Sequence, residues 1–215
     1  MHIVIFAGGT LRPGRAVREA LATADLIIAA DSGAATALQA GYTPAIIVGD
    51  FDSLALSERE LIDLGSQVIR AKVEKDETDT ELAVLTAIEH GADRVTILGG
   101  LGGERFDHAM ANILLLAGFT VPLRIIDGPT TCWLLHGPDN THIEGQTGDL
   151  LSLLPLTSDA ARIRTTGLYY PLSGDTLHFG RPRGVSNVLV SASATVSLER
   201  GILLVIHTNT QEISE

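Results

Sequence analysis

Apolar and polar positions follow two different patterns along the chain, and the change between them falls near residues 127–130. Before that point, short apolar runs alternate with stretches in which apolar residues recur every three or four positions. The runs predict strands at residues 3–6, 26–30, 45–48, 67–69, 95–98 and 123–126, and the stretches predict helices at 16–24, 34–40, 57–64, 78–90 and 108–117. Because nearly uniform apolar strands alternate with helices, we expect a doubly wound α/β domain with a mostly parallel sheet.

The second region is rich in turn residues and shows no helical period. Short β-rich runs predict strands at residues 131–135, 150–155, 161–166, 187–190, 195–198 and 202–207. Turn residues separate these runs, and the predicted turns include residues 137–140 and 174–175. This pattern is typical of an antiparallel, sandwich-like all-β domain. The sequence therefore predicts an α/β domain over residues 1–128 and a β-rich domain over residues 129–215.

Composition and charge narrow the range of functions. The 215 residues are 45% apolar and carry a formal net charge of −11, from 15 basic and 26 acidic residues. So few basic residues argue against nucleic acid as a partner, because phosphate recognition uses clustered Lys and Arg. No stretch approaches the roughly 18 apolar residues of a membrane span, so we expect no membrane partner. A single cysteine, Cys132, gives no sign of an oxidising compartment, and the cytoplasm is the expected location.

Acidic residues gather where the predicted strands end. Asp31, Asp50 and Asp52 each follow a strand, and Asp76 and Asp79 stand at the start of the helix over 78–90. Ligands of open α/β sheets bind at the carboxyl ends of the strands, so these side chains are expected to face one crevice. Carboxylates that share a crevice repel one another unless a cation neutralises them, and Mg²⁺ prefers oxygen ligands. The alternative is that single residues such as Asp31 and Asp76 only cap helices or form turns.

Two glycine-rich turns give a second signal. Residues 7–9 follow the first predicted strand, and residues 99–103 lie between the strand over 95–98 and the next helix. Such turns let backbone N–H groups approach a phosphate, although tight packing alone also requires glycine. Neither turn is a P-loop. Lys75 and Arg105 are candidates for pairing with phosphate oxygens beside the carboxylates.

Together these residues indicate a class of reaction. A metal–carboxylate cluster with glycine turns, Lys and Arg fits the transfer of a phosphorus group from a nucleotide. That chemistry depends on positioning and charge neutralisation, and it needs no nucleophilic Ser or Cys. We assign no catalytic base.

Five sequence strings resemble the successive motifs of the thiamine pyrophosphokinase family, also called thiamine diphosphokinase. They are DSGA at 31–34, PAIIVGDFDS at 44–53, KDETDTE at 75–81, LGGLGGERFDH at 98–108 and GVSN at 184–187. The first four match the family in order and approximate spacing, and the last resembles a short motif of the family's second domain. The family resemblance extends to nearly the whole chain in architecture.

The resemblance implies an ATP:thiamine diphosphotransferase, in which the thiamine hydroxyl attacks the β-phosphorus of Mg²⁺-bound ATP and AMP leaves. It also implies roles for particular residues. The metal carboxylates would be Asp31, Asp50, Asp52 and Asp79, and the catalytic residues Asp50, Asp52, Asp79, Lys75 and Arg105. The ligand-binding residues would be Asp31, Gly100, Gly102, Arg105, Asp107, Ser186 and Asn187. Gly9, in the first glycine turn, is a further candidate for ligand binding that comes from the turn itself.

The resemblance further implies a homodimer with the thiamine site between subunits, with Ser186 and Asn187 near it. The second domain would then bind thiamine and form the dimer, and the first would bind ATP and Mg²⁺. One feature departs from the family. Some members have a tryptophan shortly after the GxSN string that stacks on thiamine, whereas residues 188–194 here are aliphatic or small, and the only tryptophan is Trp133.

Two other functions are compatible with the sequence. A Mg²⁺-dependent phosphohydrolase, or a kinase of another small alcohol, would use the same site with a different acceptor. A nucleotide- or thiamine-binding regulatory module would account for the glycine turns and the β-rich region, but it would leave the clustered carboxylates without a purpose.

Overall fold

The computed structural model describes residues 1–51, 57–72, 74 and 76–213. The chain forms two compact units, Met1–Gly128 and Pro129–Glu215. The first is an α/β unit and the second an all-β unit, which confirms the predicted fold class. Among the described residues, no helix combines the length and apolar character needed to cross a membrane.

The first unit is built on a parallel sheet whose strands follow the order β6-β5-β1-β2-β3-β4. The elements run in the order β1 (His2–Phe6), α1 (Arg15–Ala22), β2 (Leu26–Ala30), α2 (Gly33–Gln39), β3 (Ile46–Gly49), α3 (Glu58–Asp63), β4 (Gln67–Arg70), α4 (Asp79–Glu89), β5 (Arg94–Leu98), α5 (Phe106–Leu115) and β6 (Leu123–Asp127). Each predicted strand and helix of this region is found, with ends shifted by at most two residues.

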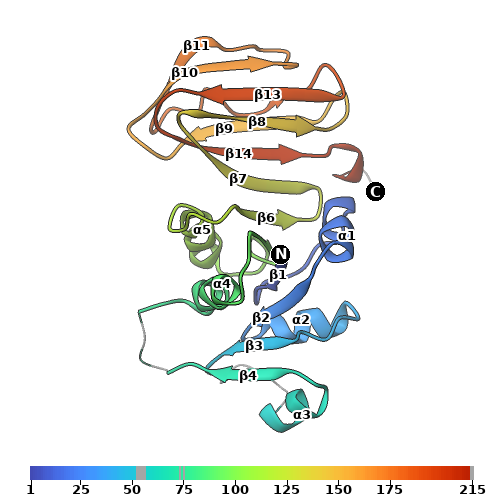
Figure 1. Cartoon of the computed structure of the whole chain (residues 1–215). Coiled ribbons are helices and arrows are strands. Elements are labelled where there is room, and N and C mark those ends of the chain that lie inside the picture. Colours follow the sequence, from blue (N-terminus) through green and yellow to red (C-terminus); the bar gives the residue numbers. More distant parts are fainter. Residues whose placement is uncertain (52–56, 73, 75, 214–215) are drawn as a thin grey trace. The chain divides into compact units, whose positions relative to one another are not determined.

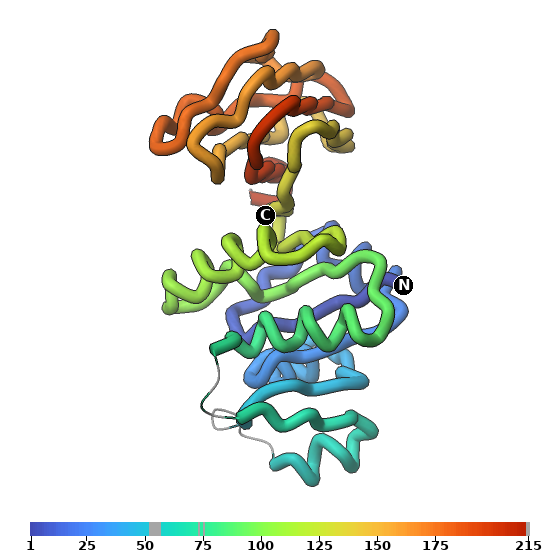
Figure 2. Tube along the Cα trace, turned by 60° about the vertical axis from the view of Figure 1, so that its left-hand side comes forward, coloured from blue at the N-terminus to red at the C-terminus, as the bar shows by residue number. Residues whose placement is uncertain are grey.

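Helices cover both faces of this sheet, so its central strands are apolar on both sides. Val4 and Phe6 of β1 pack with residues of α1, α2 and α3, whereas Ile3 and Ile5 face the other way because side chains alternate along a strand. All four are completely buried. In Figures 1 and 2, α4 and α5 lie on one face of the sheet and α1 and α2 on the other, and α4 contacts β1, β2 and β3.

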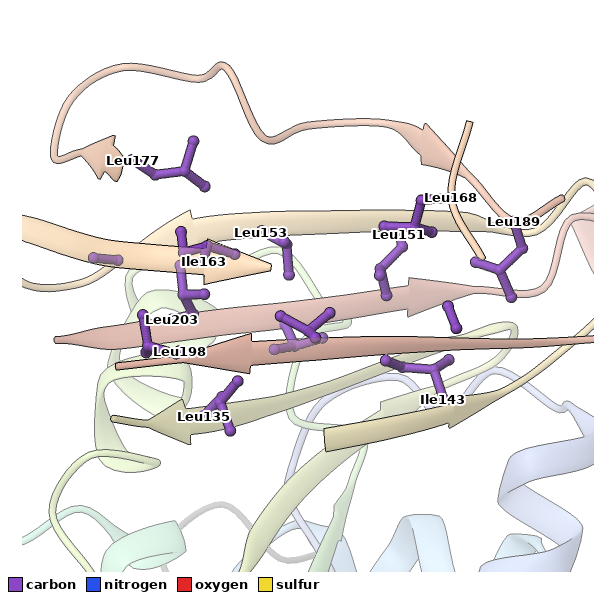
Figure 3. Packing of buried hydrophobic residues seen from close by; sticks show 14 residues of the cluster. Leu135, Ile143, Leu151, Leu153, Ile163, Leu168, Leu177, Leu189, Leu198 and Leu203 are labelled. Carbon is purple, nitrogen blue, oxygen red and sulfur yellow. The ribbon is translucent and has the colours of Figure 1, made fainter. Parts of the chain in front are cut away.

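The second unit consists of two antiparallel sheets, in the orders β12-β9-β14-β7 and β11-β10-β13-β8. Its strands are β7 (Thr130–His136), β8 (Asp139–Glu144), β9 (Leu150–Pro155), β10 (Asp159–Thr166), β11 (Ser173–His178), β12 (Asn187–Val188), β13 (Ser193–Leu198) and β14 (Ile202–Thr208), and a 3₁₀ turn follows at Gln211–Ile213. Leu151, Leu153 and Leu203 belong to the shared core with Ile163 and Leu198 (Figure 3).

The prediction missed two strands of this unit, β8 and β11. The turn residues predict turns over residues 137–140 and 174–175, but β8 begins at Asp139 and β11 includes Gly174 and Asp175. Both are edge strands of the same sheet. Each buries one apolar side chain, Ile143 in β8 and Leu177 in β11, so the alternation that reveals a strand is weak.

Candidate functional site

The strand order places the candidate site at one edge of the parallel sheet. From β1 the chain continues through β2, β3 and β4 on one side, and it then returns to β5 and β6 on the other side of β1. In open α/β sheets, ligands bind beyond the carboxyl ends of the strands at such a reversal. The reversal here lies between β1 and β5, and a glycine turn follows each of these two strands.

The two glycine turns are in direct backbone contact. A Cβ atom added to Gly9 would lie 2.2 Å from the carbonyl oxygen of Gly102 and 2.3 Å from that of Gly99. A Cβ atom on Gly102 would lie 2.4 Å from the carbonyl oxygen of Thr10. Gly99 has a φ of 68°, in the left-handed region that favours glycine. Packing therefore requires glycine at these positions, and it brings both turns together at the reversal of strand order.

The predicted residue Gly100 is held by a contact that the sequence analysis missed. The side-chain amide of the buried residue Asn112, on α5, donates a hydrogen bond of 2.8 Å to the carbonyl oxygen of Gly100. A polar residue within a helix that is mostly apolar was the only signal for this contact in the sequence. Asn112 therefore fixes the second glycine turn to the helix that follows it.

Asp31 and Gly49 bring the ends of β2 and β3 together. A Cβ atom on Gly49 would lie 2.9 Å from the Cβ atom of Asp31 and 3.1 Å from its Oδ1 atom. The backbone N–H of Asp31 also donates to the carbonyl oxygen of Val48 at 2.8 Å. Asp31 is 8% exposed and has a φ of 44°. Since Asp50 follows Gly49 directly, these two predicted carboxylate residues lie at adjacent strand ends on the same edge of the sheet.

Of the other two predicted metal residues, Asp52 and Asp79, the structure describes only Asp79. Asp79 is the first residue of α4, directly after Thr78, whose hydroxyl accepts a hydrogen bond of 3.1 Å from the N–H of Glu81. Asp52 and Lys75 lie outside the described residues. Within the described part of the chain, no group of three or more His, Cys, Asp or Glu residues forms a metal site by itself. The four-carboxylate cluster stays a prediction.

Arg105 and Asp107 form a paired unit at the start of α5. The Arg105 guanidinium donates through Nε to Oδ1 of Asp107 at 2.9 Å and through Nη2 to Oδ2 at 2.5 Å. These hydrogen bonds lower the pKa of the Asp107 carboxyl to about 2 and raise the pKa of Arg105. Both side chains are exposed. The guanidinium therefore stays charged and oriented beside the second glycine turn.

A second arginine pair anchors the segment that follows the first glycine turn. Arg12 donates through Nε to Oδ1 of Asp127 at 3.0 Å and through Nη2 to Oδ2 at 2.6 Å. Asp127, the last residue of β6, is only 2% exposed, and its carboxylate raises the pKa of Arg12. The sequence analysis did not identify this pair, because 115 residues separate its members.

The remaining predicted residues, Ser186 and Asn187, belong to the β unit. Ser186 has a φ of 57°, and its N–H donates to the Ser152 hydroxyl at 2.9 Å. The Asn187 side chain donates to the carbonyl oxygen of Tyr170 at 2.7 Å and accepts from its N–H at 3.0 Å. Asn187 thereby fixes the backbone beside two exposed rings, Tyr169 and Tyr170, whose centroids are 4.8 Å apart in an edge-to-face arrangement.

Trp133 has a different environment. Its side chain packs against the core of the β unit, and its indole N–H donates to the Thr141 hydroxyl at 3.3 Å.

Comparisons with known proteins cover both units. Residues 17–125 match the model of the thiamin pyrophosphokinase catalytic domain, and residues 140–203 match that of the thiamin pyrophosphokinase vitamin B1 binding domain. The chain is 32% identical over 185 residues to a thiamine pyrophosphokinase of Bacillus subtilis, which covers 84% of this chain and 86% of that protein.

Solved structures give the same result. A crystal structure of thiamine pyrophosphokinase from Bacillus subtilis superposes with a TM-score of 0.85 at 32% identity, covering 98% of this chain and 100% of that one. A structure of thiamin pyrophosphokinase from Geobacillus thermodenitrificans superposes with a TM-score of 0.79 at 28% identity, covering 97% and 98%. With both of its units matched in sequence and in fold, this chain belongs to the thiamine pyrophosphokinase family.

Proposed function

We propose that the protein carries out the ATP-dependent formation of thiamine diphosphate at the carboxyl edge of β5, β1, β2 and β3. In this reaction the thiamine hydroxyl oxygen forms a bond to the β-phosphorus of ATP. The bond from that phosphorus to the oxygen shared with the α-phosphate breaks, AMP leaves, and the hydroxyl proton is released. The observation that carries the proposal is the contact between the glycine turns at the reversal of strand order, with Asp31 and Asp50 at the neighbouring strand ends.

The glycine turns and the start of α5 are proposed to bind the phosphates of ATP. The backbone N–H groups of Gly9, Gly100 and Gly102 are proposed to approach the phosphates. The N-terminus of the ten-residue helix α5, which follows the second glycine turn, adds partial positive charge. Arg105, oriented by Asp107, supplies a full charge at the same place. Lys75 is proposed to neutralise phosphate charge as well.

Asp31, Asp50, Asp52 and Asp79 are proposed to hold Mg²⁺. The donor set fits this ion, because Mg²⁺ takes oxygen ligands and is commonly held by one or two carboxylates together with substrate phosphates and water. Asp31 and Asp50, whose positions are at adjacent strand ends, are proposed as such a pair. When bound, Mg²⁺ neutralises charge on the triphosphate. The protein's own part is to orient the phosphates so that the hydroxyl and the leaving oxygen are in line.

The β unit is proposed to bind thiamine. Ser186 and Asn187 lie in the segment that resembles the family motif, and Asn187 fixes Tyr170 beside Tyr169. Two exposed aromatic rings suit a planar, cationic ligand, because a ring face attracts positive charge. We further propose a homodimer in which the thiamine site is completed by a second copy. A cytoplasmic location is proposed from the single cysteine.

The test is product analysis by mass spectrometry, with purified protein, ATP and Mg²⁺, and with thiamine omitted and then restored. We expect AMP and thiamine diphosphate in equal amounts, and only when thiamine is present. ADP as the product would instead indicate transfer of a single phosphoryl group. Equal consumption of nucleotide with and without thiamine would indicate a phosphohydrolase. No product, together with nucleotide binding that is insensitive to a Mg²⁺ chelator, would indicate a regulatory module.

A further inference from the structure

Arg70 lies at the candidate site, but it belongs to none of the five family-like sequence strings and is not among the predicted site residues. It is the last residue of β4 and pairs in register with Gly49, the last residue of β3. Asp50 and Phe51 follow Gly49 directly. The Arg70 side chain therefore starts from the same carboxyl edge of the sheet as the proposed metal carboxylates.

The guanidinium of Arg70 makes three contacts around this turn. Its Nη1 atom donates to the backbone carbonyl oxygen of Asp50 at 3.1 Å. Its Cζ atom lies over the ring of Phe51, 5.5 Å from the centroid. Its Nη2 atom pairs with Glu58, the first residue of α3. One side chain thus joins the ends of β3 and β4 to the start of a helix.

The backbone at this turn needs such support. Phe51 has a φ of 63°, in the left-handed region that bulky residues rarely adopt. Residues in this region persist only where their surroundings hold them, and they concentrate at functional sites. The side chain of Phe51 packs against the core under α1, α2 and α3, which holds it from one side. Arg70 also contacts the ring of Phe51 and donates to the carbonyl oxygen of Asp50, the residue before it.

The stability gained from these contacts is small, since Arg70 is 60% exposed and exposed ion pairs contribute little to folding. The effect of these contacts on the position of the catalytic groups can be much larger, because a displacement of about 1 Å at a reacting group can reduce a rate about 100-fold. The contacts of Arg70 are therefore expected to affect catalysis much more than the free energy of unfolding.

We propose that Arg70 is a positioning residue that holds the turn at residues 49–51 in its left-handed conformation and so sets the direction of the Asp50 carboxylate. The inference rests on the proposed function for its kinetic consequences. A lysine at this position cannot replace arginine, because the role requires a planar group that lies over a ring while it donates in two directions.

The first experiment compares Arg70→Met and Arg70→Lys with Arg162→Met. Arg162 is a matched control because its side chain is 68% exposed and pairs with Glu199 in the β unit. We expect both Arg70 variants to lose kcat about 10- to 100-fold and to require several-fold more Mg²⁺ for half-maximal rate, with KM for thiamine unchanged and Tm within about 3 °C of wild type. The control should stay within two-fold of wild type. Normal kcat in Arg70→Met would overturn the proposal.

A second background tests whether Arg70 acts through the turn. Phe51→Gly removes the ring and also the penalty for positive φ, so adding Arg70→Met should then lower kcat by no more than about three-fold. The full loss in that background would mean that Arg70 does not act by holding the left-handed conformation of Phe51, against the proposal. If Phe51→Gly does not fold, Phe51→Asn serves, because asparagine also adopts the left-handed region.

A binding measurement separates this inference from the proposed function. Mn²⁺ titrated into each protein and followed by electron paramagnetic resonance should bind several-fold more weakly to Arg70→Met than to Arg162→Met. Equal Mn²⁺ affinity would overturn the role of Arg70 even if wild type makes thiamine diphosphate. If wild type makes no AMP but the difference in Mn²⁺ affinity is present, the proposed function fails and the positioning role stands.

Discussion

The two halves of the candidate site are held in place by different means. In the glycine half, after β1 and β5, backbone contacts backbone, and no side chain can be added at Gly9 or Gly102 without displacing a main-chain carbonyl. In the carboxylate half, after β2 and β3, Asp31 and Phe51 adopt positive φ, and the Arg70 side chain bonds the turn. The first half is fixed by packing of backbone on backbone. The second combines the close approach of Gly49 to Asp31 with the hydrogen bond of the exposed Arg70 side chain.

This difference separates stability from rate. A substitution that displaces packed backbone lowers the free energy of unfolding and also changes the geometry of the site. Changing an exposed or half-buried charge alters the electrostatics of the site and leaves the packing intact. Substitutions in the glycine half should therefore affect Tm and kcat together, whereas substitutions of Asp50 and Arg70 in the carboxylate half should affect kcat much more than Tm.

The largest effect on rate is expected from Asp50→Asn. The substitution keeps the size of the side chain and removes its charge, so turnover should fall about 100- to 1,000-fold, the range seen when one transition-state stabilising group is removed. Circular dichroism and Tm should match wild type. Asp63→Asn, at the exposed end of α3, is the control and should be fully active. A large loss of Tm in Asp50→Asn would abolish the distinction between the halves.

The next effect is expected from Gly9→Ala. Its Cβ atom would meet two carbonyl oxygens, so the glycine turns must separate, at a cost of about 2–3 kcal/mol. We expect Tm to fall by roughly 5–10 °C and KM for ATP to rise. Gly118→Ala is the control, since its nearest atom is 3.4 Å away. Wild-type Tm and KM in Gly9→Ala would show that the contact between the turns is not restrictive.

A smaller effect is expected from Asn112→Ala. The change removes the hydrogen bond to Gly100 and leaves a carbonyl without its donor, which costs about 1–2 kcal/mol. Tm should fall and KM for ATP should rise, as in Gly9→Ala, but both changes should be smaller. Asn140→Ala, in the exposed edge strand β8, provides the baseline. A change in kcat without any change in Tm would assign Asn112 to the chemistry instead of the packing.

The smallest effect is a dependence of stability on pH at the opposite end of the same strands. His2 is buried in β1, with Nε2 2.9 Å from the Thr96 hydroxyl of β5, and burial lowers its pKa below 6.5. The unfolded chain therefore binds a proton at a higher pH than the folded one. The stabilisation is complete above pH 6.5 and declines as the pH falls below that value.

Thermal unfolding of wild type and of His2→Gln between pH 7.5 and 5 checks this. The slope of Tm against pH should be smaller in the variant, while the pH dependence of kcat at the carboxyl edge should be unchanged. Parallel Tm profiles for the two proteins would contradict the assignment.

Much of this architecture could be predicted from the sequence, for a physical reason. Central strands such as β1 and β5 are buried on both faces over most of their length, so apolar residues dominate them and mark them clearly. The strand ends could be located for the same reason, and with them the positions of Asp31 and Asp50. Edge strands β8 and β11 bury one residue each, so their patterns resemble turns.

The contacts within the site could not be predicted. Gly9 touches Gly99 and Gly102 across about 90 residues of chain, and a glycine required by packing has the same sequence signature as one that faces a phosphate. Arg70 is one exposed arginine among many, and its role depends on a ring and a carbonyl contributed by another strand. Such contacts become visible only once the strands are placed side by side.

The position of β14 has a consequence for how the protein is made. This strand comes last along the chain, yet it lies inside its sheet, between β7 and β9. Until residues 202–208 leave the ribosome, β7 and β9 each lack the strand that pairs with both of them, and this sheet of the sandwich is incomplete. The first unit ends at residue 128 and can fold before the second is made, whereas the second cannot complete its sheet until residues 202–208 are available. Premature termination before residue 202 should therefore yield a chain with a native α/β half and an aggregation-prone remainder.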